Sequence, residues 1–266
     1  MDGKCPDRES VELIWFPTGG GKTEAYLGAA SFSLFCRRLS DKNDSGTHIL
    51  MRYTLRLLTS QQFQRASSLI CAMESIRMET GMAEKLGNDP FSIGIWVGGD
   101  TSPNKIEQAK QSLREAKRYG EDKYSLVLLR CPWCGIQMGP VKNPRSGSNF
   151  IIRGVKQIDD LSHHCPDPKC KFNHKLPVSV IDEQLYKDPP SLVIGTVDKF
   201  ASLTRMPEAR ALFGINSEGK RIKSPPGLII QDELHLITGP LGSVVGLYET
   251  LIEELCTDRR IENFTV

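Results

Sequence analysis

Long apolar runs are missing from this sequence of 266 residues. No stretch is apolar over the roughly 20 positions that a membrane-spanning helix needs, and the first residues do not form the charged and then apolar segment of a secretory signal. Internal repeats and low-complexity tracts are missing as well, which argues against solenoids and disordered linkers. We therefore expect a globular protein of one or two domains that works in the cytoplasm, away from membranes.

A large net charge is also missing. The chain has 34 Lys and Arg residues against 32 Asp and Glu residues, which leaves a formal charge of +2 at pH 7. The overall charge therefore gives no general attraction to nucleic acid. It does not exclude such a partner, because a binding groove needs only local positive charge.

A phosphate-binding loop is present, but it lacks its first glycine. The segment FPTGGGKTEAYLGAA (16–30) fits the pattern G-x-x-x-x-G-K-[ST], except that Phe16 stands at the first position. Residues 11–16 (VELIWF) predict a buried strand, and residues 23–35 predict a helix that is apolar almost all round and therefore buried. This strand–loop–helix order favours a phosphate site over an ordinary glycine-rich turn.

The loop assigns chemistry to individual positions. Lys22 is expected to reach the β- and γ-phosphates of ATP, and the hydroxyl of Thr23 is expected to hold Mg²⁺. Backbone N–H groups of the glycines are expected to close around the phosphates. The predicted ATP-binding positions in this loop are Thr18, Gly19, Gly20, Gly21, Lys22 and Thr23.

An acidic pair follows a second apolar run, residues 227–233 (GLIIQDE). This run predicts a strand, and open parallel sheets bind ligands at the carboxyl ends of their strands. Asp232 is expected to hold Mg²⁺ and to complete the ATP site. Glu233 is expected to polarise the attacking water as a general base. An isolated acidic turn is the alternative. The upstream loop favours a catalytic set of Lys22, Asp232 and Glu233.

Strand and helix patterns alternate along the chain. Strands are predicted over residues 48–53, 91–97, 124–130 and 191–196, with helices over 60–77, 102–120 and 242–255. This alternation predicts an α/β fold with a parallel sheet. The pattern breaks between residues 131 and 188, which are rich in Pro, Gly, Asn and Cys. We expect this segment to be an inserted module, resembling a zinc ribbon, within a domain formed by residues 1–130 and 189–266.

The inserted segment carries two cysteine pairs. C-x₂-C is followed by thirty residues and then C-x₄-C, in which the cysteines are Cys131, Cys134, Cys165 and Cys170. A cytosolic nucleotide-binding protein keeps its thiols reduced, so we predict a tetrahedral Zn²⁺ site with a structural role rather than disulfides. His163, His164 and His174 could replace a cysteine as ligands, but four thiolates already fill the coordination sphere, and we expect these histidines at the surface.

The motifs together resemble a known enzyme family. PTGGGKT (17–23) and DELH (232–235) resemble the first RecA-like lobe of superfamily 2 DExH helicases. The segments at 53–65, 97–99 and 195–200 are similar to motif Ia, a glycine doublet and motif Ib. In such enzymes these loops touch the nucleic-acid backbone, so the resemblance implies the following contact residues: Arg52, Arg56, Gln62, Thr196 and Lys199. Solvated polar side chains are the alternative. By the same resemblance, His235 would link the nucleotide site to neighbouring motifs.

The amino-acid sequences of three segments make the resemblance more specific. RYTLRLLTSQQFQRA (52–66), GTVDKFA (195–201) and QDELHLITGPLGS (231–243) resemble the helicase subunit of DISARM, a bacterial anti-phage system. This likeness implies phage DNA as the substrate, in preference to RNA, and other defence subunits as partners. The motifs of a second RecA-like lobe, including its arginine finger, are missing from the sequence. We therefore expect one lobe of a larger ATP-dependent helicase or translocase.

Two other interpretations of these motifs remain open. A small-molecule P-loop kinase would need an arginine-bearing lid and an acceptor pocket, and the late DELH segment argues against it. A zinc-bearing scaffold that binds nucleotide or a partner without turnover is compatible with the sequence.

Overall fold

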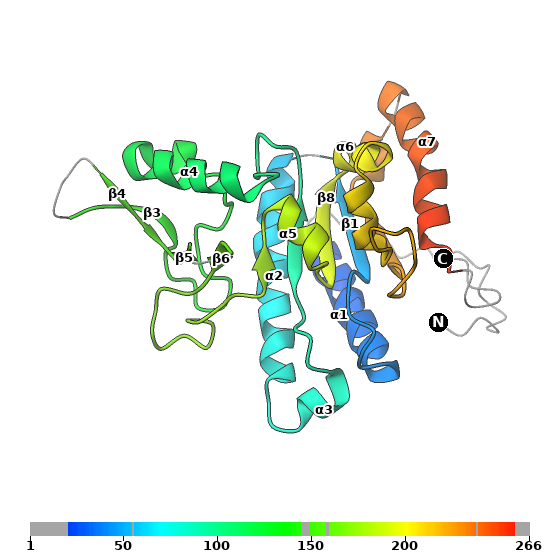
Figure 1. Cartoon of the computed structure of the whole chain (residues 1–266), viewed down its shortest axis with the longest axis horizontal. Coiled ribbons are helices and arrows are strands. Elements are labelled where there is room, and N and C mark those ends of the chain that lie inside the picture. The colour runs from blue at the N-terminus through cyan, green and yellow to red at the C-terminus, as the bar shows by residue number, and fades with distance from the viewer. Residues whose placement is uncertain (1–20, 55, 145–148, 158–159, 238, 259–266) are drawn as a thin grey trace.

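A parallel five-stranded sheet forms the centre of the protein (Figure 1). The computed structural model describes residues 21–54, 56–144, 149–157, 160–237 and 239–258. Every pairing in the sheet is parallel, and the strand order is β7-β2-β8-β1-β9. The strands are β1 (Ile49–Tyr53), β2 (Ile93–Trp96), β7 (Val178–Ser179), β8 (Leu192–Thr196) and β9 (Leu228–Gln231). The predicted α/β class with a parallel sheet is confirmed, whereas the strand predicted at 11–16 lies outside the described residues.

Helices connect these strands. They are α1 (Lys22–Ser40), α2 (Arg56–Arg77), α3 (Met82–Leu86), α4 (Ile106–Tyr119), α5 (Asp182–Lys187), α6 (Val197–Phe200) and α7 (Gly239–Cys256). Short 3₁₀ segments lie at 120–123, 201–204, 207–213 and 234–236. No helix among those described is long and apolar enough to cross a membrane.

Both faces of the sheet are covered, because alternate side chains of a strand point to opposite sides. Ile49 and Met51 of β1 join one buried cluster with side chains of α1 and α2. Leu50, between them, joins a second cluster with side chains of α5, α6 and α7. Parallel strands covered on both faces consist almost entirely of apolar residues, which is why these runs were recognisable in the sequence.

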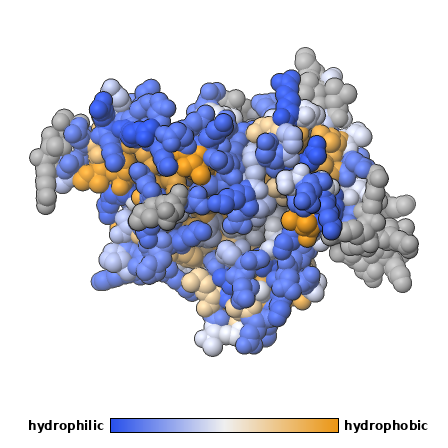
Figure 2. Space-filling view, in the orientation of Figure 1, coloured by the Kyte–Doolittle hydropathy of each residue, from blue (hydrophilic) through white to orange (hydrophobic). Residues whose placement is uncertain are grey.

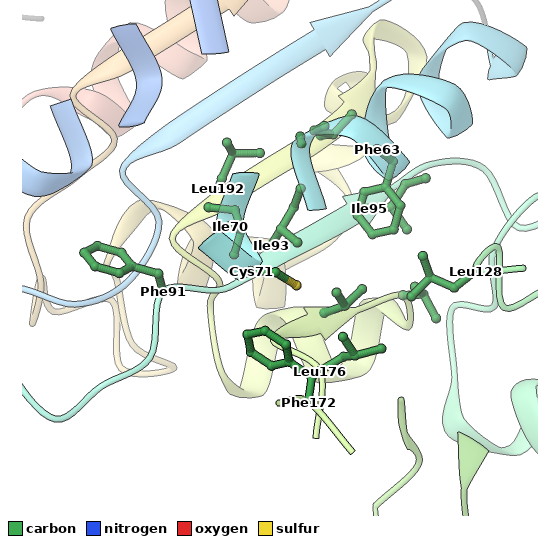
Figure 3. Close-up of a cluster of buried hydrophobic side chains, with 14 of the residues drawn as sticks. Phe63, Ile70, Cys71, Phe91, Ile93, Ile95, Leu128, Phe172, Leu176 and Leu192 are labelled. Carbon is green, nitrogen blue, oxygen red and sulfur yellow. The ribbon is translucent and has the colours of Figure 1, made fainter. Parts of the chain in front are cut away.

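The inserted segment shares the first of these clusters rather than forming a core of its own (Figure 3). It contains the antiparallel hairpin of β3 (Gly139–Lys142) and β4 (Phe150–Arg153), and the pair β5 (Val155–Lys156) and β6 (Ser162–His163). Phe172 and Leu176 of the insert are buried in the same cluster as Phe63 and Ile70 of α2. The insert is therefore attached to the domain by apolar packing as well as by its two chain connections.

The predicted strand at 124–130 does not form. Val127 adopts a left-handed backbone conformation (φ 61°), and the N–H of Leu128 donates to the carbonyl of Leu126. Leu126 and Leu128, which flank the turn, are both buried. Only Arg130 makes an isolated bridge, with Gln137.

Two predicted boundaries also move. β7 pairs with β2 through Val178 and Ile93, so the main sheet resumes before residue 189, where the insert was expected to end. The helix predicted from residue 102 begins at Ile106. The carbonyls of Pro103 and Asn104 accept hydrogen bonds from the first residues of α5 instead of continuing a helical turn.

Helix α1 forms as predicted but is not buried all round. Its buried residues are Ala30, Leu34 and Arg38, whereas Phe32 is 73% exposed. The helix therefore covers the sheet with one face only.

Candidate functional site

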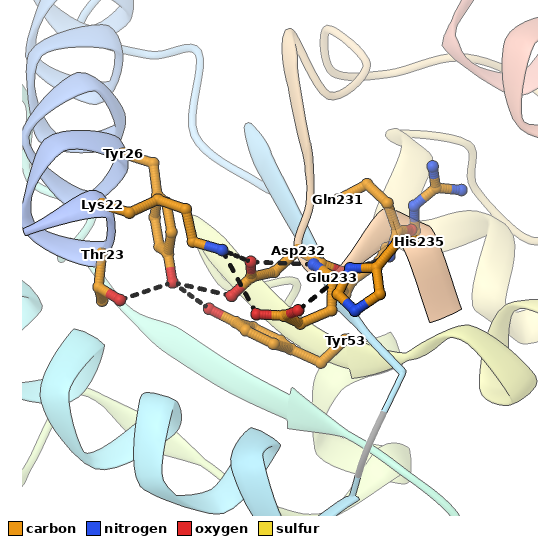
Figure 4. A network of polar contacts seen from close by, with 9 residues as sticks. Lys22, Thr23, Tyr26, Tyr53, Gln231, Asp232, Glu233 and His235 are labelled. Atoms are coloured by element: carbon orange, nitrogen blue, oxygen red, sulfur yellow. Dashed lines mark hydrogen bonds and ion pairs between the residues drawn. The ribbon is translucent and has the colours of Figure 1, made fainter. Parts of the chain in front are cut away.

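The predicted catalytic residues meet at the edge where the carboxyl ends of the strands lie, here called the carboxyl edge (Figure 4). Lys22 is the first residue of α1, and Asp232 and Glu233 directly follow β9. The Nζ atom of Lys22 lies 2.7 Å from Oδ1 of Asp232 and 3.4 Å from Oε1 of Glu233. Three side chains from opposite ends of the chain thus form one charged group.

Burial differs across this group. The Lys22 side chain is 51% exposed, whereas that of Asp232 is 11% exposed. The hydrogen bond from the ammonium to Asp232 raises the pKa of Lys22, and the nearby charge of Glu233 acts in the same direction. Lys22 therefore stays protonated and lies where an anion arriving from solvent can reach it.

Two tyrosines surround the acidic residues, and sequence reasoning missed both. The Tyr26 hydroxyl lies 3.2 Å from Oγ1 of Thr23, 3.3 Å from Oδ2 of Asp232 and 3.1 Å from the hydroxyl of Tyr53. Burial raises the pKa of both tyrosines, so their hydroxyls stay protonated at neutral pH. The available signal was spacing, since Tyr26 lies three residues after Thr23, on the same face of α1.

Glu233 occupies an unusual backbone position. Its φ of 51° is left-handed, and its N–H donates to Oδ1 of Asp232 over 2.9 Å. Non-glycine residues in this region carry strain, and they cluster at functional sites. His235 is exposed, and its Nδ1 lies 3.4 Å from Oε2 of Glu233. The turn thus points both carboxylates toward the start of α1.

The donor set suits a phosphate with a divalent cation. A lysine ammonium at a helix N-terminus suits phosphate oxygens, and a carboxylate with a hydroxyl offers the oxygen ligands that Mg²⁺ prefers. Thr23 and Asp232 are joined through the Tyr26 hydroxyl, so both potential ligands lie on one side of the site. Gly21 has a left-handed φ of 85°, as a turn before the helix requires. Thr18, Gly19 and Gly20 lie outside the described residues.

The four clustered cysteines come together in the insert. One sulfur atom from each of Cys131, Cys134, Cys165 and Cys170 lies within 4.8 Å of the others, and the Sγ atoms of Cys134 and Cys165 are 3.5 Å apart. Tetrahedral Zn²⁺ with bonds of about 2.3 Å separates its sulfur ligands by about 3.8 Å, so the spacing fits this ion.

Backbone turns fix the two cysteine pairs. The N–H of Gly135 donates to the carbonyl of Cys131, and Gly135 has a φ of 77°. In the second pair, the N–H of Asp167 donates to Sγ of Cys165 over 3.4 Å. His163 and His164 do not belong to the cysteine group, and His163 is buried although we expected it at the surface. The arrangement can hold a metal ion through sulfur alone.

Two of the predicted nucleic-acid contact residues, Arg52 and Lys199, are not exposed to solvent. Arg52 is buried and forms an ion pair with Glu249 of α7. Lys199 is also buried, with its Nζ 2.5 Å from Asp182 and 3.1 Å from Oδ1 of Asn104. Burial raises the pKa of the Asp182 carboxyl, and the ion pair with Lys199 opposes that rise. In this conformation both cations join elements of the domain to one another.

The other three predicted contacts differ in exposure. Thr196 is buried at the end of β8, and Gln62 is half-buried on α2. Arg56 begins α2, but its side chain lies outside what the structure describes. The structure therefore does not gather the five predicted residues into one open surface.

Comparison with known proteins relates the chain to a larger protein. The chain is similar to the DISARM protein DrmA of Bacillus paralicheniformis, with 39% identity over 304 aligned positions. The alignment takes in 99% of the chain and 26% of the relative, so the chain spans about a quarter of that curated protein's length. No family model matches the chain. This similarity supports a relation to DISARM proteins, as the sequences of the three motif segments predicted.

Proposed function

We propose that this chain is the ATP-binding lobe of a nucleic-acid-dependent ATPase of helicase superfamily 2, with a RecA-like fold. The observation that carries the proposal is the meeting of Lys22, Asp232 and Glu233, with 2.7 Å between Lys22 Nζ and Asp232 Oδ1. These residues come from a phosphate-loop sequence and an acidic strand end. They lie at the edge of a parallel sheet where α/β proteins bind nucleotides.

Each residue has a distinct role in this proposal. Lys22 exchanges its carboxylate partners for the β- and γ-phosphate oxygens, which compete for the same protons. Thr23 and Asp232 hold Mg²⁺, which supplies charge neutralisation at the phosphates when bound. Glu233 accepts a proton from the attacking water once Lys22 has moved away. Tyr26 keeps Thr23 and Asp232 on the same side of the site.

Turnover in this proposal needs more than the chain's own site. Among the described residues, Lys22 is the one lysine or arginine that forms an ion pair with Asp232 or Glu233, and it is assigned to phosphate binding. An arginine that stabilises the transferring phosphoryl group contributes roughly 10³ to 10⁵ in rate in related sites. We assign this arginine to a second RecA-like lobe elsewhere in the longer protein.

The similarity to DrmA is our basis for proposing a biological setting. DrmA is named as a DISARM protein, and we extend that setting to this chain: anti-phage defence in the cytoplasm, with DNA as the nucleic acid and other defence subunits as partners. The longer protein would act as a helicase or translocase. The lobe comprises the residues before 131 together with those from about 178 onward, because β7 already belongs to the main sheet.

We also propose that the four clustered cysteines hold a structural Zn²⁺. Four sulfur ligands leave no open coordination position for a substrate, which argues for structure rather than catalysis. Ordering of the insert would then depend on the metal, because metal binding supplies folding free energy to segments that are poor in apolar residues.

Calorimetric titration with Mg·ATP tests the nucleotide site. The wild-type chain should bind with measurable heat, and Lys22→Ala should abolish the signal because it removes the cation at the phosphates. Lys85→Ala, an exposed lysine of α3, is the matched control and should bind as the wild type does. Equal affinities for wild type and Lys22→Ala would refute the site. In the longer protein, stimulation of ATP hydrolysis by DNA but not by a nucleoside separates this enzyme from a small-molecule kinase.

A further inference from the structure

A groove of about 950 Å³ lies between the end of α4 and the β3–β4 hairpin. Helix α4 contributes three cations to its lining, Arg114, Lys117 and Arg118, against one carboxylate, Glu115, whose Oε1 accepts a hydrogen bond from Gln111. The rings of Tyr119 and Phe150 also line the groove. The helix comes from the main domain, and the hairpin comes from the insert. The groove therefore exists only because the insert folds back against α4.

The cations of the groove are open to solvent. Lys117 and Arg118 are exposed, and neither forms an ion pair within the described part of the chain. Arg114 lies 3.2 Å from Glu107, but both side chains are about two-thirds exposed or more, and such a surface pair is weak. By contrast, Arg52 and Lys199 are buried against acidic partners. The groove thus offers positive charge that the predicted contact residues do not.

Aromatic rings accompany these charges. Tyr119 is 62% exposed beside Arg118. Phe150 packs against Gly120, where an added Cβ would lie 2.7 Å from the ring and where φ is 77°. Gly120 therefore lets the hairpin approach the end of the helix closely. Asn143 and Asn149 of the hairpin add amide groups to the lining.

Helix α4 connects the carboxyl edge of the sheet to the groove. α4 begins ten residues after β2 ends, at Ile106, and then runs away from the sheet above the insert (Figure 1). Fourteen residues of helix span about 21 Å. Hydrophilic side chains gather over α4 on this face of the molecule (Figure 2). A strand that crosses the carboxyl edge can therefore follow the helix into the groove.

We propose that this groove binds the backbone of single-stranded nucleic acid, with a base stacked on Tyr119. Grooves that hold single strands combine cations that follow the phosphates with aromatic rings that stack on bases. An acidic peptide would satisfy the cations but would leave the exposed ring without a partner. The inference rests on the proposed function in one respect, because it adds a second contact region for the same nucleic-acid partner.

Fluorescence anisotropy with a labelled oligothymidine of about 16 nucleotides tests the groove. Lys117→Gln combined with Arg118→Gln removes two phosphate contacts. For single strands, each contact contributes about 0.7 to the slope of log affinity against log salt, so the slope should fall by about 1.4. The affinity should fall by about 25-fold at about 0.1 M salt. Tyr119→Ala should weaken binding by roughly 5- to 150-fold and leave the slope unchanged.

Two exposed lysines outside the groove provide the matched control. Lys85→Gln combined with Lys220→Gln removes the same charge and should leave both affinity and slope as in the wild type. The inference is overturned if the groove and control variants bind equally, or if the wild type does not bind the oligonucleotide. It is also overturned if polyglutamate competes as well as unlabelled oligothymidine, because the groove would then be a site for acidic protein.

The anisotropy measurement contains no ATP, so its outcome is independent of the ATP site. Titration of the groove variants with Mg·ATP should give the wild-type affinity. If ATP fails to bind any of these proteins while the oligonucleotide binds as expected, the proposed function fails and the groove stands. If Mg·ATP binds but the oligonucleotide does not bind as expected, the groove proposal fails and the ATP site stands.

Discussion

The hydroxyl oxygens of Tyr26 and Tyr53 lie 3.1 Å apart beneath the acidic pair, and that of Tyr26 is also 3.3 Å from Oδ2 of Asp232. Tyr26 belongs to α1 and Tyr53 ends β1, so this contact joins the first helix to the sheet at the site. The pair fixes the position of Asp232 without contributing charge.

Tyr26→Phe should weaken binding of Mg·ATP by about 2- to 12-fold, because a hydrogen bond of this kind contributes about 0.5–1.5 kcal/mol. Binding of ATP without Mg²⁺ should change less, since the lost hydroxyl contacts the two expected magnesium ligands. Calorimetry with and without the metal measures both effects. Tyr119→Phe, an exposed tyrosine on α4, controls for loss of a hydroxyl. Unchanged affinity for Mg·ATP would contradict this role for Tyr26.

Glu233→Gln should preserve ATP binding in the longer protein and stop hydrolysis. The amide keeps the shape of the side chain but cannot accept a proton, and loss of a general base costs on the order of 10² to 10⁴ in rate. Phosphate release under single-turnover conditions measures this loss, with Glu218→Gln as an exposed control. The chain on its own should hydrolyse almost no ATP. Rapid hydrolysis by the chain alone that survives Glu233→Gln would refute both the base and the need for a second lobe.

The cysteine cluster should bind one equivalent of Zn²⁺. Cys134→Ser and Cys170→Ser should each lose the metal, as elemental analysis would show, whereas Cys36→Ser, an exposed cysteine outside the cluster, should retain it. If both cluster variants kept full zinc, the ligands would have to lie elsewhere, with the nearby histidines as the next candidates.

Loss of zinc should also lower the stability of the whole domain, because Phe172 and Leu176 of the insert share a buried cluster with α2. Uncovering one such side chain costs about 1.5–3 kcal/mol, which lowers Tm by about 3–12 °C in a domain of this size. Thermal unfolding followed by circular dichroism of Cys134→Ser and Cys36→Ser measures the difference. Equal Tm values would show that the insert does not support the sheet.

Acid should destabilise the fold through His48. Burial lowers the pKa of His48 from 6.5 to about 4, and the charge of Arg37 acts in the same direction. Arg37 donates to Nδ1 over 2.8 Å, and Nε2 lies 2.7 Å from the Ser33 hydroxyl, so a proton on Nδ1 would face the guanidinium. The unfolded chain binds this proton more readily, so stability falls as pH drops below about 6.5.

This histidine should make the free energy of unfolding about 2 kcal/mol lower at pH 5 than at pH 7. Urea unfolding of wild type and His48→Gln at both pH values measures its share, because all other titrating groups are common to the two proteins. His48→Gln should reduce the pH dependence by about that amount. Identical pH dependence in the two proteins would contradict the assignment.

Local patterns predicted the central strands well. β1, β2, β8 and β9 are apolar runs because the sheet is covered on both faces, and this makes them visible without any knowledge of the fold. β7 is two residues long and carries no such signal. Residues 124–130 carry the signal but turn at Val127, and Leu126 and Leu128 are buried in the cluster that the insert shares with the domain.

Part of the candidate site could also be predicted from local sequence patterns. Spacing within a loop predicted that Lys22 and Thr23 belong to one site. Spacing within two short turns predicted the cysteine pairs. Contacts that depend on tertiary packing were out of reach, such as the buried ion pair of Lys199 with Asp182. The sequence shows that Lys199 is a cation beside a motif, but only the fold shows that α5 brings a carboxylate to it.

The place of β8 in the sheet has a consequence for how the protein is made. β8 lies between β1 and β2, although it follows both in the chain. Among the described strands, β2 therefore has no partner until β7 is synthesised, and all four clustered cysteines precede β7. A ribosome adds about 5–20 residues per second, so the four cysteines emerge before β8, the strand that joins β1 to β2. The Zn²⁺ that we propose for these cysteines can therefore bind before the central sheet is complete.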